Sequence, residues 1–245
     1  SPISRPYLAY ISPISLGHAP PAQLTGAGRY GSCCVEMDIW EANRRATAFT
    51  PHSCNVTEAT RCEGTACGDD AAGERFEGVC DKNGCDFQPY RLGDTSFYGA
   101  GAGFAIDTTQ KVTVVTQFLT HDGTDDGDLV EIRRLYKQAG RLVANPAVEV
   151  VGGGRHDSIT SGFCAATAAL FDDGTNYLAK GGFASMDDAH SKGMVLVMSI
   201  WDDHAVNMHW LDSTYPHGSA EPGAARGPCP TSGGSPAQEW TIRAE

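Results

Sequence analysis

The alternation of hydrophobic and polar residues predicts a protein built mainly from β-strands. Residues 104–107, 111–119 and 129–136 alternate in this way or are rich in β-branched side chains, which is typical of strands with one face on a core. Gln138-Ala139-Gly140 lies between the third segment and a further β-rich run, residues 141–143, and predicts a hairpin turn. We therefore expect mostly antiparallel pairing.

Three segments depart from simple alternation. Residues 193–201 are apolar on both faces, which predicts a strand buried in a sandwich. Residues 159–171 contain an Ala-rich stretch that predicts a short helix beginning near Ser161. Asp173-Gly174 would stop this helix, and residues 183–190 predict a second one. The pattern as a whole predicts an all-β fold, an antiparallel β-sandwich with one or two short helices.

Residues 44–103 show little periodicity and predict a long loop region rich in Gly, Asp and Cys. Loops of this length are usually functional when disulfide bonds hold them. Nine cysteines indicate an oxidising compartment, hence a secreted, extracellular protein. A zinc site is less favoured, because Cys62-x4-Cys67 and Cys80-x4-Cys85 lack close cysteine pairs and histidines. Asn55-Val56-Thr57 is a glycosylation sequon.

The length and net charge of the chain indicate how many domains it has and which kinds of partner suit it. A chain of 245 residues predicts one domain with a sizeable core. Its net charge of −12 argues against nucleic acid or an anionic membrane surface as the partner and suits a neutral substrate. No apolar run approaches the roughly 18 residues of a membrane span.

Three carboxylates lie within six residues of each other in the string Glu36-Met-Asp38-Ile-Trp-Glu41. On a strand, Glu36 and Asp38 project from one face, about 6 to 7 Å apart along the chain. The offset of five would turn Glu41 to the other face unless one extra residue restores the parity. We therefore predict a β-bulge near Ile39 or Trp40.

Clustered carboxylates suit chemistry that needs one ionised and one protonated acid at neutral pH, because like charges push their pKa values apart. Glycoside hydrolysis is such a reaction, and strand neighbours suit the short carboxylate separation of a retaining enzyme. Taken alone, the string also fits an exposed strand edge or a metal loop.

The string from Cys33 to Asn43 resembles the active-site strand of glycoside hydrolase family 7, the fungal-type cellobiohydrolases and endoglucanases. Further segments are similar to that family in order, from about Thr25 to about Gln238: residues 50–52, 62–64, 83–85, 89–93, 95–99, 111–118, 193–203 and 210–216. Laminarin-type β-1,3-glucanases share a similar acidic motif, but these downstream matches count against them.

The resemblance implies a concanavalin-like jelly roll whose concave sheet carries a cleft. Residues 1–24 do not match the family and are expected to be irregular, whereas residues 25–245 would form part of the catalytic domain. Family members have a long N-terminal half before the acidic strand, so we expect this chain to be a fragment that lacks it. The odd number of cysteines agrees with that expectation.

The resemblance also assigns the cysteines. It pairs Cys54 with Cys80, Cys62 with Cys67, and Cys85 with Cys164. It places the partners of the three remaining thiols in the missing half; these are Cys33, Cys34 and Cys229. We therefore expect long loops held by disulfide bonds, with three thiols unpaired inside this chain.

Catalytic roles follow from the resemblance. Glu36 is expected to be the nucleophile, Glu41 the general acid/base, and Asp38 the residue that orients and tunes Glu36. His52 matches an active-site histidine that hydrogen-bonds near the cleavage point, although a single histidine after proline is more often a surface or satisfied core residue. Two carboxylates suffice for this mechanism, so we expect no metal and no organic cofactor.

Substrate-binding positions are implied in the same way. Trp201 and Trp210 match sugar platforms, since a flat indole presents an apolar face to a glucose ring; either residue alone is more often a core tryptophan. Further matches to substrate-contacting positions are Arg75, Asn83, Arg91, Asp202, Tyr215 and Arg226. An exposed arginine is usually only a solvated charge, so these assignments depend on the resemblance.

Two segments bear on the mode of attack. Residues 67–80 and 215–229 match loops that cover a tunnel and that endoglucanases of the family shorten. The resemblance therefore implies a monomeric cellobiohydrolase that takes cellulose or a cello-oligosaccharide chain and releases cellobiose from reducing ends. The alternatives are an endo-β-1,4-glucanase of the same family and a truncated, catalytically inactive glucan-binding remnant.

Overall fold

The computed structural model describes residues 30–63, 66, 76–172, 174–200, 202–203 and 205–235. Within them the strands are β1 (Gly31–Cys33), β2 (Glu36–Ala42), β3 (Thr47–His52), β4 (Thr60–Cys62), β5 (Tyr98–Gly99), β6 (Ile106–Asp107), β7 (Thr113–Thr120), β8 (Leu129–Gln138), β9 (Arg141–Ala144), β10 (Val148–Val150), β11 (Gly154–His156) and β12 (Ile159–Thr160). The helices are α1 (Ser161–Phe171), α2 (Gly182–Lys192) and the single turn α3 (His209–Asp212). The predicted all-β class is confirmed, with one short helix more than expected.

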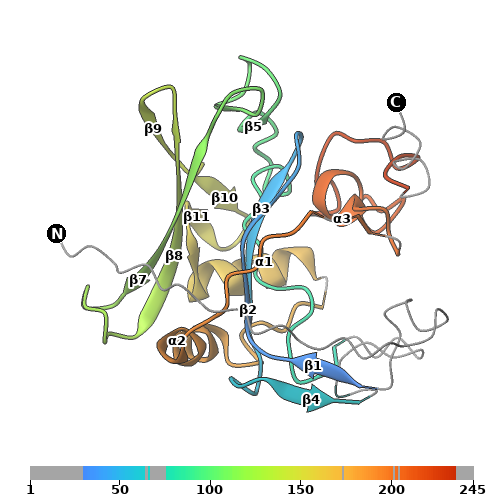
Figure 1. Ribbon diagram of the computed structural model, residues 1–245. Coiled ribbons are helices and arrows are strands. Elements are labelled where there is room, and N and C mark those ends of the chain that lie inside the picture. Colours follow the sequence, from blue (N-terminus) through green and yellow to red (C-terminus); the bar gives the residue numbers. More distant parts are fainter. Residues whose placement is uncertain are drawn as a thin grey trace, which may run out of the picture.

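The largest sheet is built on β8. Strand β7 pairs with one edge of β8, and β9 and β12 share its other edge, all antiparallel. The predicted hairpin turn is confirmed, because Gln138 pairs with Arg141 and the two residues between them, Ala139 and Gly140, have positive φ. This sheet faces the β2–β3 ribbon, and the two form the layers of a partial β-sandwich (Figure 1).

Strand β3 lies inside the region that we predicted as loop, and that part of the prediction is wrong. Thr47 to Thr50 are all buried, so β3 shows no alternation of polar and apolar positions. It also contains Pro51, which argues against a strand in sequence because proline donates no ladder hydrogen bond. Tertiary burial on both faces overrides both local signals. The described strand pairs are antiparallel, as expected, except for the short parallel pairing of β5 with β6.

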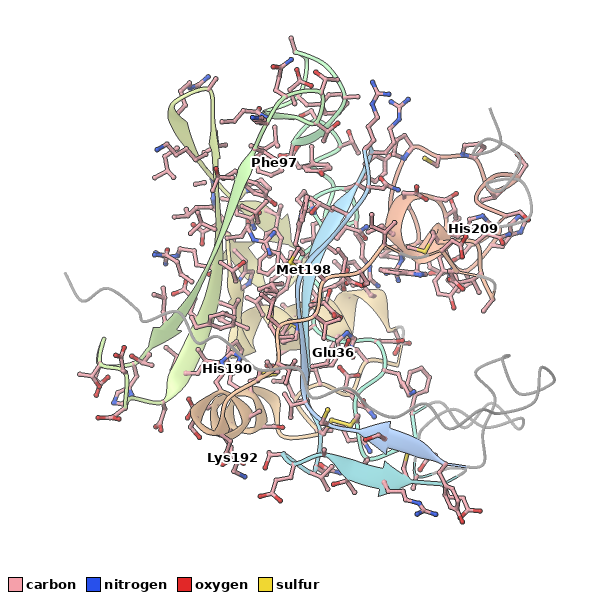
Figure 2. The ribbon with its side chains drawn as sticks, in the orientation of Figure 1. Glu36, Phe97, His190, Lys192, Met198 and His209 are labelled. Atoms are coloured by element: carbon pink, nitrogen blue, oxygen red, sulfur yellow. A yellow bond between two sulfur atoms is a disulfide. The ribbon has the colours of Figure 1, made fainter. Side chains whose placement is uncertain are left out.

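The strand predicted at residues 193–201 is not observed. Residues 193–200 are irregular, and Val195, Val197 and Ile200 are 70%, 75% and 94% exposed. The segment connects α2 to α3 (Figure 1), and Met198 on it is labelled in Figure 2. A strand requires a hydrogen-bonded neighbour, and no described strand pairs with these residues. Trp201 lies outside the described residues.

Both predicted helices are confirmed. Helix α1 begins at Ser161, where the side chain of Thr160 caps it by accepting a hydrogen bond from the Phe163 amide. It ends at Phe171, and Asp172 adopts the left-handed conformation that commonly terminates helices. Helix α2 extends the predicted range by one or two residues at each end.

The main core lies where β3, α1 and the segment around Phe87 meet. Phe87 stacks between Phe49 and Phe163, with ring centroids 5.6 and 5.0 Å away. All three rings are almost completely buried. Burial of aromatic side chains contributes strongly to stability, so this stack fixes β3, and with it the ribbon, against the helix.

The predicted disulfide bonds Cys54–Cys80 and Cys85–Cys164 are confirmed. Cys62 is also disulfide-bonded, and its predicted partner lies outside the described residues. Cys34 and Cys229 are free thiols, in agreement with the expectation for this chain. The side chain of Cys33 is not described.

The Cys85–Cys164 bond should stabilise the protein more than the Cys54–Cys80 bond does, because its sequence separation is 79 residues and that of Cys54–Cys80 is 26. We expect the double variant Cys85→Ser/Cys164→Ser to lose about 4 kcal/mol of unfolding free energy in urea titrations. Cys34→Ser is the control, since that thiol is exposed and free. Equal unfolding midpoints for the parent and the double variant would contradict the prediction.

Candidate active site

The predicted bulge is present between strands β2 and β3. Asp38 pairs with Thr50 and Glu41 pairs with Ala48, so β2 contains one residue more than β3 over this interval. Glu36 pairs with His52 on the other side of the bulge. The extra residue restores the parity. Glu36, Asp38 and Glu41 therefore project from one face, together with His52 and Thr50.

His52 connects this row of carboxylates to the loop behind it. Its Nε2 lies 3.0 Å from Oδ2 of Asp38, and its Nδ1 lies 3.1 Å from the carbonyl oxygen of Asp81. Burial opposes the charged imidazolium, but the hydrogen bond and charge of Asp38 outweigh it and raise the pKa of His52 to about 9. At neutral pH, His52 is therefore a cation that donates a hydrogen bond to each of the two oxygens.

The environment raises the pKa of Glu36. Partial burial of its carboxyl is the main cause, and the negative charge of Asp38 and a hydrogen bond with Asp38 act in the same direction. The positive charges of His52 and Lys82 oppose the shift by favouring the ionised carboxylate. Glu36 is labelled on β2 in Figure 2.

Glu41 holds its proton more strongly than an ordinary glutamic acid does. Burial, followed by the charge of Asp38, raises the pKa of Glu41 to about 7. The hydroxyl of Thr50 donates a hydrogen bond of 3.2 Å to Oε2 of Glu41 and partly offsets this shift. A carboxylic acid with a pKa near 7 can serve as general acid and, once deprotonated, as general base.

Gly84 allows the loop to approach this row closely. A Cβ at this position would lie 2.2 Å from Cγ2 of Thr50 and 2.8 Å from Cε1 of His52, and φ is +73°. Both the contact distances and the backbone conformation therefore require glycine. Sequence reasoning did not assign a role to Thr50, Asp81 or Gly84. The signal was present, since Thr50 lies two residues before His52 and so shares its face.

A second group of predicted residues lies on the segment after α3. Arg226 lies over the Tyr215 ring, with its guanidinium carbon 5.7 Å from the ring centroid, so these two predicted substrate contacts are neighbours. The segment is tied to the end of β2 because the side-chain amide of Asn43 donates a 2.5 Å hydrogen bond to the carboxylate of Asp212. In Figure 1, α3 lies beside β3.

Arg91 makes its described contacts inside the protein. It forms an ion pair with Asp86, its Nε donates a 3.1 Å hydrogen bond to the carbonyl of Gly223, and its guanidinium carbon lies 3.9 Å from the centroid of Phe171. Its side chain is 5% exposed. These contacts hold the 213–226 segment against the core, and a role of Arg91 in binding substrate stays a prediction.

The remaining predicted residues are dispersed. Asn83 is half-buried, and its backbone N–H donates a 3.3 Å hydrogen bond to the carboxylate of Asp81. Asp202 and Trp210 are also half-buried. Arg75 and Trp201 lie outside the described residues. Within the described part of the chain, no group of three or more His, Cys, Asp and Glu side chains is arranged to hold a metal ion. No helix there is long and apolar enough to cross a bilayer.

Relatives with solved structures share this fold. A cellobiohydrolase from Daphnia pulex superposes with a TM-score of 0.85 at 53% identity, over 89% of this chain and 49% of that one. A cellobiohydrolase from Melanocarpus albomyces, solved in complex with cellotetraose, superposes with a TM-score of 0.78 at 42% identity, over 88% of this chain and 48% of that one.

Sequence comparison agrees with the structural match. An exoglucanase, GH7B, from Limnoria quadripunctata is 51% identical over 216 residues, which are 88% of this chain and 47% of that protein. The chain thus spans about half the length of the relatives it matches. The family model described as "Glycosyl hydrolase family 7" matches residues 16–244. With that match over most of its length, the chain belongs to glycosyl hydrolase family 7.

Proposed function

We propose that the row of carboxylates on β2 performs retaining hydrolysis of β-1,4-glucosidic bonds. The observation that carries the proposal is the bulge that brings Glu36, Asp38 and Glu41 to one face, beside a cationic His52. In retaining hydrolysis, one carboxylate attacks the anomeric carbon while the other protonates the leaving oxygen.

Each carboxylate has a separate task in this mechanism. Ionised Glu36 attacks the anomeric carbon and forms a glycosyl-enzyme, while the protonated carboxyl of Glu41 gives its proton to the departing glucosidic oxygen. The Glu41 carboxylate then takes a proton from water, which attacks the same carbon and releases Glu36. Asp38, held by His52, orients Glu36 and keeps the pKa of Glu41 high.

The substrate that fits these features is a cellulose or cello-oligosaccharide chain. Two relatives at more than 50% identity are an exoglucanase and a cellobiohydrolase. Residues 215–229, which include Tyr215 and Arg226, resemble in sequence a loop that covers a tunnel in this family. We therefore favour release of cellobiose from reducing ends by a secreted, monomeric enzyme that needs no cofactor. Random shortening of soluble cellulose, with little cellobiose, would favour an endoglucanase instead.

The purified 245-residue chain should release the aryl group from an aryl cellobioside, and Glu36→Gln should reduce this activity to background, because the amide cannot form the glycosyl-enzyme. Glu149→Gln is the matched control, since the Glu149 side chain is 71% exposed on β10 and should leave turnover unchanged. A parent chain that is folded but inactive would contradict the proposal. It would favour the alternative, a truncated glucan-binding remnant without catalytic activity.

The dependence of kcat/KM on pH should carry the signature of Glu41. Because burial and Asp38 raise the pKa of Glu41 to about 7, the protonated acid is lost as pH rises through that value. We expect kcat/KM to fall about tenfold per pH unit above it. Glu41→Gln should lose about 10²–10⁴-fold in activity and lack this limb. If kcat/KM of Glu41→Gln still fell above that pH, the fall would come from another titrating group and the prediction would be wrong.

A further inference from the structure

Strand β8 carries an arginine in the row of side chains that faces the core. Every second side chain of this strand lies on its inward face, and those of Ile132, Arg134 and Tyr136 are each 0% exposed. A buried charge is costly unless it is paired or hydrogen-bonded. The position of Arg134 therefore calls for a specific partner.

That partner is the bulge of β2. The Arg134 guanidinium donates a hydrogen bond from Nη2 to the carbonyl oxygen of Ile39, 95 residues away in the sequence. Its central carbon also lies 4.4 Å from the ring centroid of Phe49 on β3 and 5.8 Å from that of Tyr136. The side chain thus contacts both strands of the ribbon at the bulge.

The neighbouring strand explains why the Ile39 carbonyl needs this donor. At the bulge, Ile39 and Trp40 lie opposite the single residue Phe49. The amide of Phe49 is directed away from β2, since it donates to the carbonyl of Phe87, and the Phe87 amide donates back at 3.0 Å. The ladder therefore cannot supply the Ile39 carbonyl from Phe49, and a side chain from the facing sheet does so.

We infer that Arg134 is a positioning residue for the proposed hydrolysis: its hydrogen bond to Ile39 fixes the bulge that turns Glu41 to the face of Glu36 and Asp38. This inference rests on the proposed function, because the role is defined by the proton transfer that Glu41 performs. Arg134 itself lies behind the ribbon, so it acts through the backbone and does not touch the reacting atoms.

A test must separate positioning from packing. We expect Arg134→Met, which keeps much of the side-chain volume but removes the donor, to lower kcat for a phenyl cellobioside about 100-fold with little change in KM. A 2,4-dinitrophenyl cellobioside needs little proton donation when its leaving group departs, so its kcat/KM, which reports that first step alone, should fall less than about tenfold. Equal losses on both substrates, or none on either, would overturn the inference.

Two further variants complete the kinetic test. Arg133→Met is the matched control, since the adjacent Arg133 side chain is 42% exposed and pairs with Glu131; it should behave as the parent on both substrates. Arg134→Lys keeps the charge and a donor and should recover part of the phenyl cellobioside activity. If Arg134→Met does not fold, Arg134→Lys replaces it in the test. The activity that Arg134→Lys loses relative to the parent must then be larger on the phenyl cellobioside than on the dinitrophenyl cellobioside.

A measurement without substrate separates failure of this inference from failure of the proposed function. The carboxyl carbon of Glu41 is titrated by NMR in the folded parent and variants. If the hydrogen bond of Arg134 fixes the bulge, its loss should move Glu41 out of its place beside Asp38, so the pKa of Glu41 should shift away from about 7 in Arg134→Met but not in Arg133→Met. An unchanged titration in Arg134→Met would overturn the inference, even for a chain without turnover.

Discussion

Between Asp38 and Glu41, strand β2 contains one residue more than the strand opposite it, and this register shift decides which way Glu41 points. Without the extra residue, Glu41 would lie on the opposite face from Glu36. The face of the ribbon that the three carboxylates share is therefore set by a backbone feature. Two facing layers support it, since Phe49 joins the core stack and Arg134 reaches the Ile39 carbonyl from β8.

The electrostatic character of the site follows from this geometry. Burial disfavours the ionised forms of Glu36 and Glu41, and the negative charge of Asp38 on the same face acts in the same direction. His52 limits the effect because it pairs with Asp38 and its positive charge lowers the pKa of both glutamates. As a result, Glu41 has a pKa near neutrality, and Asp38 beside it is paired with the cationic His52. This arrangement suits acid and base steps at one site.

Polar contacts hold the loops around the site more than periodic structure does. The Gln88 side-chain amide donates to the carbonyls of Leu211 and Arg226, Arg91 bonds to Gly223, and Asn43 bonds to Asp212. Together these bonds fix the 209–226 segment beside the end of β2. Disulfide bonds do the same on the other side, where Cys54–Cys80 and Cys85–Cys164 secure the segment that contains Asp81 and Gly84.

The sequence by itself determined the features that depend on local geometry. The alternation in β8, the β-rich composition of β7, the Ala139-Gly140 turn and helix α1 all follow from patterns and caps within a few residues. The bulge follows from strand parity once the three carboxylates are required to share one face. The resemblance to a family supplied the disulfide pairing, which spacing alone leaves open.

Only the tertiary structure decided features that need a distant partner. Strand β3 is buried on both faces and has no period to detect, and residues 193–200 are apolar yet irregular because no described strand pairs with them. The buried charge of Arg134 is explained by a carbonyl 95 residues away. The physical reason is common to all three: a hydrogen bond or buried face is satisfied by whichever group the fold brings near, and one segment's pattern does not specify that group.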